Sequence, residues 1–264
     1  MRKCDRSTQS TKDLALAAIR HFGVLFLDPF PKKGADSRLT RFTFVSLSFM
    51  LLVISAQAQP PAQTEEWKQL FNGKDLTGWK HVGPGQMTVE DGLIRTHGGM
   101  GLLYWTGGKL GNCVIRVVFK MHDHNDNSGV YIRIPIEPRE PWMPVHYGYE
   151  VQIDNEPEDS NADEYHATGA LYSLTKPLAR PGKPGPEWNA MEITLDGPRT
   201  IVVLNGVKVT DYTEGQPVPP KRFEFEPERG PRPNEGYFGL QNHNKDDVVF
   251  FKEVAYRPLK SVRS

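Results

Sequence analysis

Short runs in which apolar and polar residues alternate recur from about residue 67 to residue 259. Alternation with a period of two sends neighbouring side chains to opposite faces of a strand, so these runs predict half-buried β-strands. The longest β-branched run, residues 112–121, is expected in the middle of a sheet. Further strands are predicted within residues 87–96, 102–105, 168–174, 188–196, 200–212, 236–243 and 248–259.

Turn signals separate these runs. Asp91-Gly92 and Asn205-Gly206 are pairs favoured in tight type I′ hairpin turns, and Asp196-Gly197 marks another turn. After residue 58, no ten-residue segment with helical periodicity is free of Gly and Pro. Ten or more short strands with such turns predict an all-β domain in which two antiparallel sheets pack as a sandwich or jelly roll.

The stretch from Asn127 to Asp154 carries the most informative side chains. In its second strand Glu150, Gln152 and Asp154 are expected on one face, with the aliphatic Val151 and Ile153 on the other. A merely solvated face is one interpretation of such alternation, but carboxylates and an amide in a row favour a functional cleft.

The first strand of this stretch shows the same alternation. Tyr131 and Arg133 are expected on one face, opposite Val130, Ile132 and Ile134. A proline-broken loop that contains Trp142 and His146 joins the two strands. Together the two strands are predicted to place acid, amide, phenol and guanidinium groups in one hollow.

The charges are divided unevenly along the chain. The 264 residues hold 32 Lys or Arg and 32 Asp or Glu, but residues 1–58 hold nine and four, which leaves 23 and 28 for the remainder. A mildly acidic remainder disfavours nucleic acid as a partner. Arg38 and Arg41 precede an apolar run that ends at Ala56-Gln57-Ala58, the pattern of a secretory signal peptide cut after Ala58.

This signal predicts a secreted or periplasmic protein with no stable membrane insertion after cleavage. A transmembrane anchor is the alternative, but the apolar run is shorter than the roughly 20 residues that span a bilayer. Because 37 residues precede Arg38, translation is expected to start near Leu39. The predicted organisation is then a signal region (1–58), a flexible leader (59–66) and one β-sandwich domain (67–260).

The sequence after residue 58 contains no recognisable metal-binding or cofactor-binding motif. Cys113 is the one cysteine after residue 58 and is expected to be a buried, inert thiol. His122 and His124 lie in a polar loop without a third ligand at a diagnostic spacing, and the acidic loop after Asp154 lacks the glycine of a calcium-binding loop. No metal site and no cofactor are predicted.

Seven motifs together resemble one family. They are L-F-N-G-K-D-L-T-G-W, N-S-G-V-Y-I-R, E-V-Q-I-D, T-G-A-L-Y, E-W-N-A-M-E-I, L-N-G-V and G-L-Q-N-H, in that order between about Trp67 and Leu259. The order is similar to that in the 3-keto-disaccharide hydrolases, a secreted bacterial family with a concanavalin A-like sandwich. Asn242 departs from the family, which often has an acidic residue there.

The resemblance implies cleavage of a glycoside or oligosaccharide whose sugar carries a ketone at C3. Such a ketone acidifies the C2 hydrogen, so a base can remove it, the C1 oxygen leaves, and hydration of the enone completes a net hydrolysis. The candidates are Glu150 or Asp154 as base, Arg133 as enolate or hydroxyl anchor, His243 or Tyr172 as proton donor, Asn127, Tyr131, Gln152 and Gln241 as hydrogen-bonding groups, and Trp142 as a stacking platform.

Two other functions remain open from the sequence. Retaining glycoside hydrolysis would need a carboxylate pair about 5–5.5 Å apart, whereas positions i and i+4 of a strand lie about 13 Å apart. Glu150 and Asp154 could therefore form that pair only across a β-bulge. A carbohydrate-binding module without catalysis would present stacking aromatic residues and dispensable carboxylates. Arg133 could also form a structural ion pair with Glu150.

Overall fold

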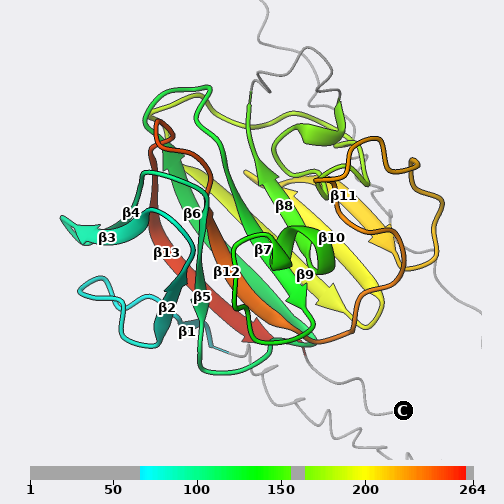
Figure 1. Ribbon diagram of the computed structural model, residues 1–264, viewed down its shortest axis with the longest axis horizontal. Coiled ribbons are helices and arrows are strands. Elements are labelled where there is room, and N and C mark those ends of the chain that lie inside the picture. The colour runs from blue at the N-terminus through cyan, green and yellow to red at the C-terminus, as the bar shows by residue number, and fades with distance from the viewer. Residues whose placement is uncertain (1–65, 156–163, 260–264) are drawn as a thin grey trace, which may run out of the picture. The chain divides into compact units, whose positions relative to one another are not determined.

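The computed structural model describes residues 66–155 and 164–259, which form two antiparallel sheets (Figure 1). The predicted signal peptide, the leader up to residue 65 and the acidic segment 156–163 lie outside the described residues. The predicted all-β sandwich is confirmed.

The larger sheet has eight strands. In spatial order they are β11 (Val207–Thr213), β10 (Arg199–Leu204), β9 (Asn189–Asp196), β6 (Cys113–Met121), β13 (Val249–Pro258), β4 (Leu93–His97) and β3 (Gln86–Glu90), with β1 (Lys68–Gln69) paired to β13. Strand β6 pairs with β9 on one side and with β13 on the other, which confirms its predicted place inside the sheet.

The smaller sheet has five strands. Their order is β2 (Trp79–Val82), β5 (Gly101–Trp105), β12 (Tyr237–Asn242), β7 (Ser128–Ile134) and β8 (Tyr149–Ile153). The proline-broken segment between β7 and β8 contains a short helix, α1 (Met143–Tyr147), and a 3-10 turn, η1 (Glu164–His166), follows β8. Within residues 66–155 and 164–259 no helix is long and apolar enough to cross a membrane.

Two hairpins form as predicted. Asp91 and Gly92 have φ values of 50° and 76° between β3 and β4, and Asn205 and Gly206 have 49° and 81° between β10 and β11. Two consecutive positive φ angles are the requirement of a type I′ turn, which Asn or Asp followed by Gly meets with little strain.

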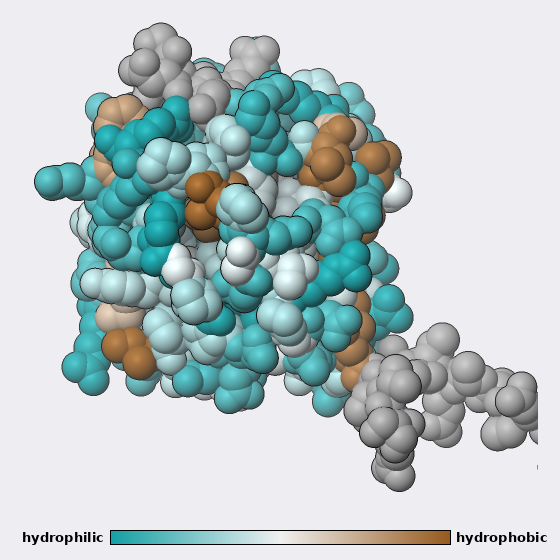
Figure 2. All heavy atoms as spheres, turned by 90° about the vertical axis from the view of Figure 1, so that its right-hand side faces the viewer, coloured by the Kyte–Doolittle hydropathy of each residue, from teal (hydrophilic) through white to brown (hydrophobic). Residues whose placement is uncertain are grey.

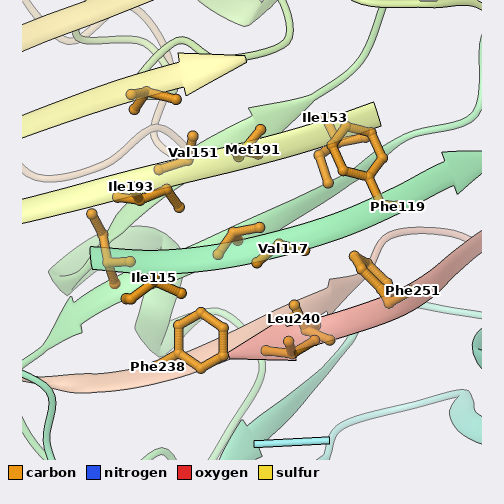
Figure 3. Packing of buried hydrophobic residues seen from close by; sticks show 14 of the residues in the cluster. Ile115, Val117, Phe119, Val151, Ile153, Met191, Ile193, Phe238, Leu240 and Phe251 are labelled. Atoms are coloured by element: carbon orange, nitrogen blue, oxygen red, sulfur yellow. The ribbon is translucent and has the colours of Figure 1, made fainter. Parts of the chain in front are cut away.

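Aliphatic side chains from both sheets meet in the core (Figure 3). Val151 and Ile153 of β8 are fully buried, in one cluster with Met191 and Ile193 of β9. Burial of each such side chain contributes about 1.5–3 kcal/mol, and a slip of one residue would turn the whole row outward. The core therefore fixes that Glu150, Gln152 and Asp154 face away from it.

Cys113 is 3% exposed at the start of β6. Burial raises the pKa of its thiol to about 12, so the thiolate does not form near neutral pH. The expectation of a buried thiol is confirmed.

Residues 168–174 do not form the predicted strand. Gly169 and Ser173 have φ values of 90° and 62°, which interrupt an extended chain. The segment instead runs along the outer edge of β8, where Gly169 N–H donates to the Gln152 carbonyl at 2.9 Å and Tyr172 N–H to the Glu150 carbonyl at 2.9 Å. It therefore covers the edge of β8 and forms a wall beside its polar face.

The prediction that Arg133 shares a face with Glu150 is wrong. Arg133 has φ 55°, and the register of β12 against β7 shifts between Tyr237 and Gly239, so a bulge breaks the alternation. The guanidinium of Arg133 donates to the carbonyls of Pro233 (3.0 Å), Gly197 (2.8 Å) and Arg199 (3.1 Å). It does not pair with Glu150, and it ties the end of β7 to the β9–β10 turn of the larger sheet.

We expect Arg133→Gln to lower the free energy of unfolding by about 2–3 kcal/mol, because buried carbonyls would lose their donors. Urea denaturation measures this change. Arg139→Gln, at the exposed position directly after Pro138, is the control and should leave stability nearly unchanged. Equal stability of the two variants would contradict the structural role of Arg133.

Candidate active site

A pocket of about 440 Å³ opens over the polar face of β8 and the end of β12. This volume is within the range of small-molecule sites, about 300–1,000 Å³. Its walls come from α1, from η1 and the segment after it, from the β4–β5 loop, and from the loops that follow β6, β11 and β12. The lining residues are Met100, Asn125, Asn127, Trp142, Val145, Glu150, Gln152, Asp154, His166, Tyr172, Phe225, Gln241, His243, Asn244 and Asp247.

Glu150, Gln152 and Asp154 form one row of the pocket lining, as predicted, and each is at most 4% exposed. Burial raises the pKa of Glu150 to about 7, although the charge of His243 and hydrogen bonds with Tyr131 and Gln241 partly offset this effect. A carboxyl group with a pKa near neutrality is suited to accept and return a proton.

His243 and Asp247 form an ion pair on the loop after β12. His243 Nδ1 lies 2.6 Å from Asp247 Oδ2, and Asp247 Oδ1 accepts the backbone N–H of Asn127 at 3.0 Å. Burial opposes the charged imidazolium, but the hydrogen bond and charge of Asp247 and the charges of Glu150 and Asp154 outweigh it and raise the pKa of His243. The geometry leaves Nε2 as the ring nitrogen that can face a ligand.

Side-chain amides complete the polar part of the pocket. Gln152 Nε2 donates to Asn127 Oδ1 at 3.3 Å, Asn127 Nδ2 donates to Asp154 Oδ2 at 3.2 Å, and Gln241 Nε2 donates to the Tyr131 hydroxyl at 2.7 Å. Within the described part of the chain, Oε1 of Gln152 and Oε1 of Gln241 are buried without a hydrogen-bond partner. Buried acceptors of this kind suit ligand hydroxyl groups.

Aromatic side chains form the other walls. His166 and Tyr172 stack with their ring centroids 4.8 Å apart. Trp142, the N-cap residue of α1, is 44% exposed, and Phe225 of the β11–β12 loop is 45% exposed. The β11–β12 loop passes beside α1, to the right in Figure 1.

The structure brings together eight of the ten predicted site residues, namely Asn127, Trp142, Glu150, Gln152, Asp154, Tyr172, Gln241 and His243. Tyr131 is fully buried beside the pocket and reaches it through Gln241 and Glu150. Arg133 is not a lining residue. Asn242 is also buried away from the lining, and its amide donates to the His97 carbonyl at 2.7 Å.

Sequence reasoning missed Asp247, His166 and Phe225, which all lie outside the strands. Asp247 follows His243 by four residues in the sequence, but in a loop this spacing does not predict that the two side chains meet. In residues 66–155 and 164–259, no three His, Cys, Asp or Glu side chains are grouped to hold a metal ion.

Comparison with known proteins gives concordant matches. Residues 66–260 match the family described as 3-keto-alpha-glucoside-1,2-lyase-like domain. A 3-keto-disaccharide hydrolase of Bacteroides thetaiotaomicron is 24% identical over 242 residues, which cover 76% of this chain and 81% of that protein.

Solved structures show the same fold. Two crystal structures of proposed glycosyl hydrolases from Parabacteroides distasonis are each 26% identical and cover 74% of this chain. The match includes 94% of the first protein's chain, with a TM-score of 0.62, and 100% of the second protein's chain, with a TM-score of 0.59. The fold class is thus the concanavalin A-like sandwich, and the matched residues span the whole described domain. The chain belongs to the family of 3-keto-alpha-glucoside-1,2-lyase-like domains.

Proposed function

We propose that this chain is a carbohydrate-active enzyme that cleaves glycosides whose sugar carries a ketone at C3. The family match and the name of the Bacteroides relative support the substrate class. The observation that carries the proposal is Glu150, a carboxyl group with a pKa of about 7 in a pocket lined by amides and a histidine. Because a predicted signal peptide precedes the domain, we also propose that the enzyme acts in the periplasm or outside the cell.

The first step is removal of the C2 proton. The C3 ketone acidifies this hydrogen, and the Glu150 carboxylate accepts it while the C2–H electron pair forms an enolate between C2 and C3. The raised pKa makes Glu150 a stronger base than an exposed glutamate. The imidazolium of His243 supplies a positive charge that stabilises the enolate, the role that the sequence had suggested for Arg133.

The second step breaks the glycosidic bond. The enolate returns its electrons to re-form the C3 ketone, a double bond forms between C1 and C2, and the C1–O bond breaks. His243, held by Asp247, is the group that donates a proton to the departing oxygen. Its raised pKa keeps it protonated for this purpose near neutral pH.

Hydration closes the cycle. Water adds its oxygen to C1 of the enone while neutral His243 accepts the proton of that water. Protonated Glu150 returns its proton to C2, so both side chains regain their starting states. The net reaction is hydrolysis of the glycoside, with the C3 ketone retained in the sugar.

The regular pairing of β8 favours elimination over a retaining mechanism. Strand β8 pairs with β7 without a register shift from Ser128–Ile153 to Ile132–Tyr149. Without a bulge, Glu150 and Asp154 stay about 13 Å apart along the strand, whereas a retaining pair needs about 5–5.5 Å.

Replacement of the base tests this proposal. With a 3-keto glucoside as substrate, Glu150→Gln should lower kcat by about 10²–10⁴-fold and change KM little, because the amide keeps the shape of the carboxyl group but cannot accept the proton. Asp154→Asn, at the other end of the same row, should have a much smaller effect on kcat.

The unoxidised glucoside is measured in parallel with the wild-type protein. Turnover of the plain glucoside would contradict the proposal in favour of ordinary glycoside hydrolysis. Binding of both sugars without turnover of either would identify a carbohydrate-binding module instead.

The pH dependence of kcat/KM gives an independent test. The value of kcat/KM should rise with pH around 7 as Glu150 loses its proton, and it should fall at higher pH as His243 loses its proton. Asp247→Asn removes the hydrogen bond and charge that raise the pKa of His243, so the falling limb should move to lower pH.

Asp246→Asn is the matched control, since this neighbouring carboxylate is 81% exposed. It should leave both limbs in place. A falling limb that Asp247→Asn does not move would exclude His243 as the proton donor.

A further inference from the structure

The pocket lining changes in chemical character from one end to the other. The polar end is formed by Asn125, Asn127, Asp154, Asn244 and Asp247, which come from the loops after β6 and β12 and from the end of β8. The apolar end is formed by Trp142, Val145 and Phe225, which come from α1 with its N-cap residue and from the β11–β12 loop. Asn127 is hydrogen-bonded to both Asp154 and Asp247 at the polar end, and Val145 at the apolar end belongs to a hydrophobic cluster with Tyr131 and Ile134 of β7.

Glu150 lies between these two ends. It follows α1 by three residues, so it is the member of the row on β8 that lies next to the helix carrying Val145. Asp154 is four residues further along, about 13 Å away for an extended strand. A ligand that reacts at Glu150 therefore has the polar end on one side and the apolar end on the other.

The aromatic wall at the apolar end is built on buried supports. Phe225 precedes Glu226, which is 0% exposed and accepts hydrogen bonds from the backbone N–H of Arg222 (2.8 Å) and the guanidinium of Arg229 (3.1 Å). Phe225 also stacks on Phe223 with centroids 5.1 Å apart and planes 6° apart. Its half-exposed ring is thus presented by a fixed loop.

The same loop is tied to α1. Glu228 N–H donates to the carbonyl of His146 at 3.0 Å, and the guanidinium of Arg232 donates to the carbonyls of His146 and Gly148, both at 3.0 Å. On the face shown in Figure 2, which is the right-hand side of Figure 1, apolar groups form small separate patches on a mostly polar surface. Trp142 and Phe225 are thus two exposed aromatic residues that line one pocket and lie on segments bonded to each other.

We infer that the apolar end binds the leaving group of the glycoside and selects an aromatic aglycone over a second sugar. This inference rests on the proposed function and names its substrate class. Hydroxyl groups of a second sugar would lose water against Val145 and Phe225 without gaining hydrogen-bond partners. An aromatic ring would bury apolar surface there and stack on Trp142 and Phe225.

The reaction geometry agrees with this orientation. The proton leaves C2 and the aglycone leaves the adjacent C1, so both bonds must lie near Glu150. The hydroxyl-bearing part of the keto sugar then extends toward the polar end, past Gln152 and Gln241, whose buried Oε1 atoms accept its hydroxyl hydrogen bonds. The aglycone extends the other way, toward Trp142.

The test compares the 3-keto derivatives of phenyl glucoside and of a glucosyl-glucose disaccharide. For the wild-type protein, kcat/KM should be at least about tenfold higher for the phenyl substrate. Trp142→Ala and Phe225→Ala should each lower this value by about tenfold, mainly through KM, and change that of the disaccharide by less than about threefold. Tyr147→Ala, an exposed aromatic residue of α1 that does not line the pocket, should change neither.

Calorimetry with the unoxidised sugars separates this inference from the proposed reaction. Phenyl glucoside should bind the wild-type protein more tightly than the disaccharide and lose affinity in Trp142→Ala, whether or not the keto sugars are cleaved. Equal or tighter binding of the disaccharide, or equal losses for both ligands in the variants, would overturn the apolar subsite. Failure to cleave either keto sugar would instead overturn the proposed function.

Discussion

The burial of one face of β8 is the constraint on which the site depends. Val151 and Ile153 pack between the two sheets, and their burial contributes about 3–6 kcal/mol together. Glu150 is carried to the opposite face of the same strand, where a rise of its pKa to about 7 means that ionisation costs about 3 kcal/mol more than in water. The contribution of the core is at least as large as this cost, so β8 can hold the Glu150 carboxyl group where it is shielded from water.

A second set of contacts adjusts this carboxyl group. The charge of His243 lowers the pKa of Glu150, and Glu150 in turn helps to raise that of His243. Asp247 holds His243 through Nδ1 and is itself bonded by the backbone of Asn127, which begins the turn into β7. A carboxyl group and an imidazole of opposite charge are thus held at the pocket by β8 and by the loop that follows β12, and these two strands lie on either side of β7.

The sequence predicts those parts of the site that depend on strand alternation. The row on β8 follows from the aliphatic residues between its members, and the hairpin turns follow from Asp-Gly and Asn-Gly pairs. Alternation fails at Arg133, where a positive φ and a bulge send the side chain toward the other sheet. It fails also at residues 168–174, where the backbone angles of Gly169 and Ser173 break the extended chain. Phe225 and Asp247 come from loops and His166 from the 3-10 turn η1. The paths of these segments depend on tertiary contacts that no local pattern encodes.

A measurement of the protonation state of Glu150 in the folded protein decides whether burial raises the pKa of this carboxyl group. A ¹³C NMR titration of protein labelled at the glutamate side-chain carboxyl groups measures it, and the signal that Glu150→Gln removes assigns the residue. That signal should titrate with a pKa of about 7. If it titrates with the pKa of an exposed glutamate, about 4.3, Glu150 is not desolvated, and the account of the pocket is contradicted.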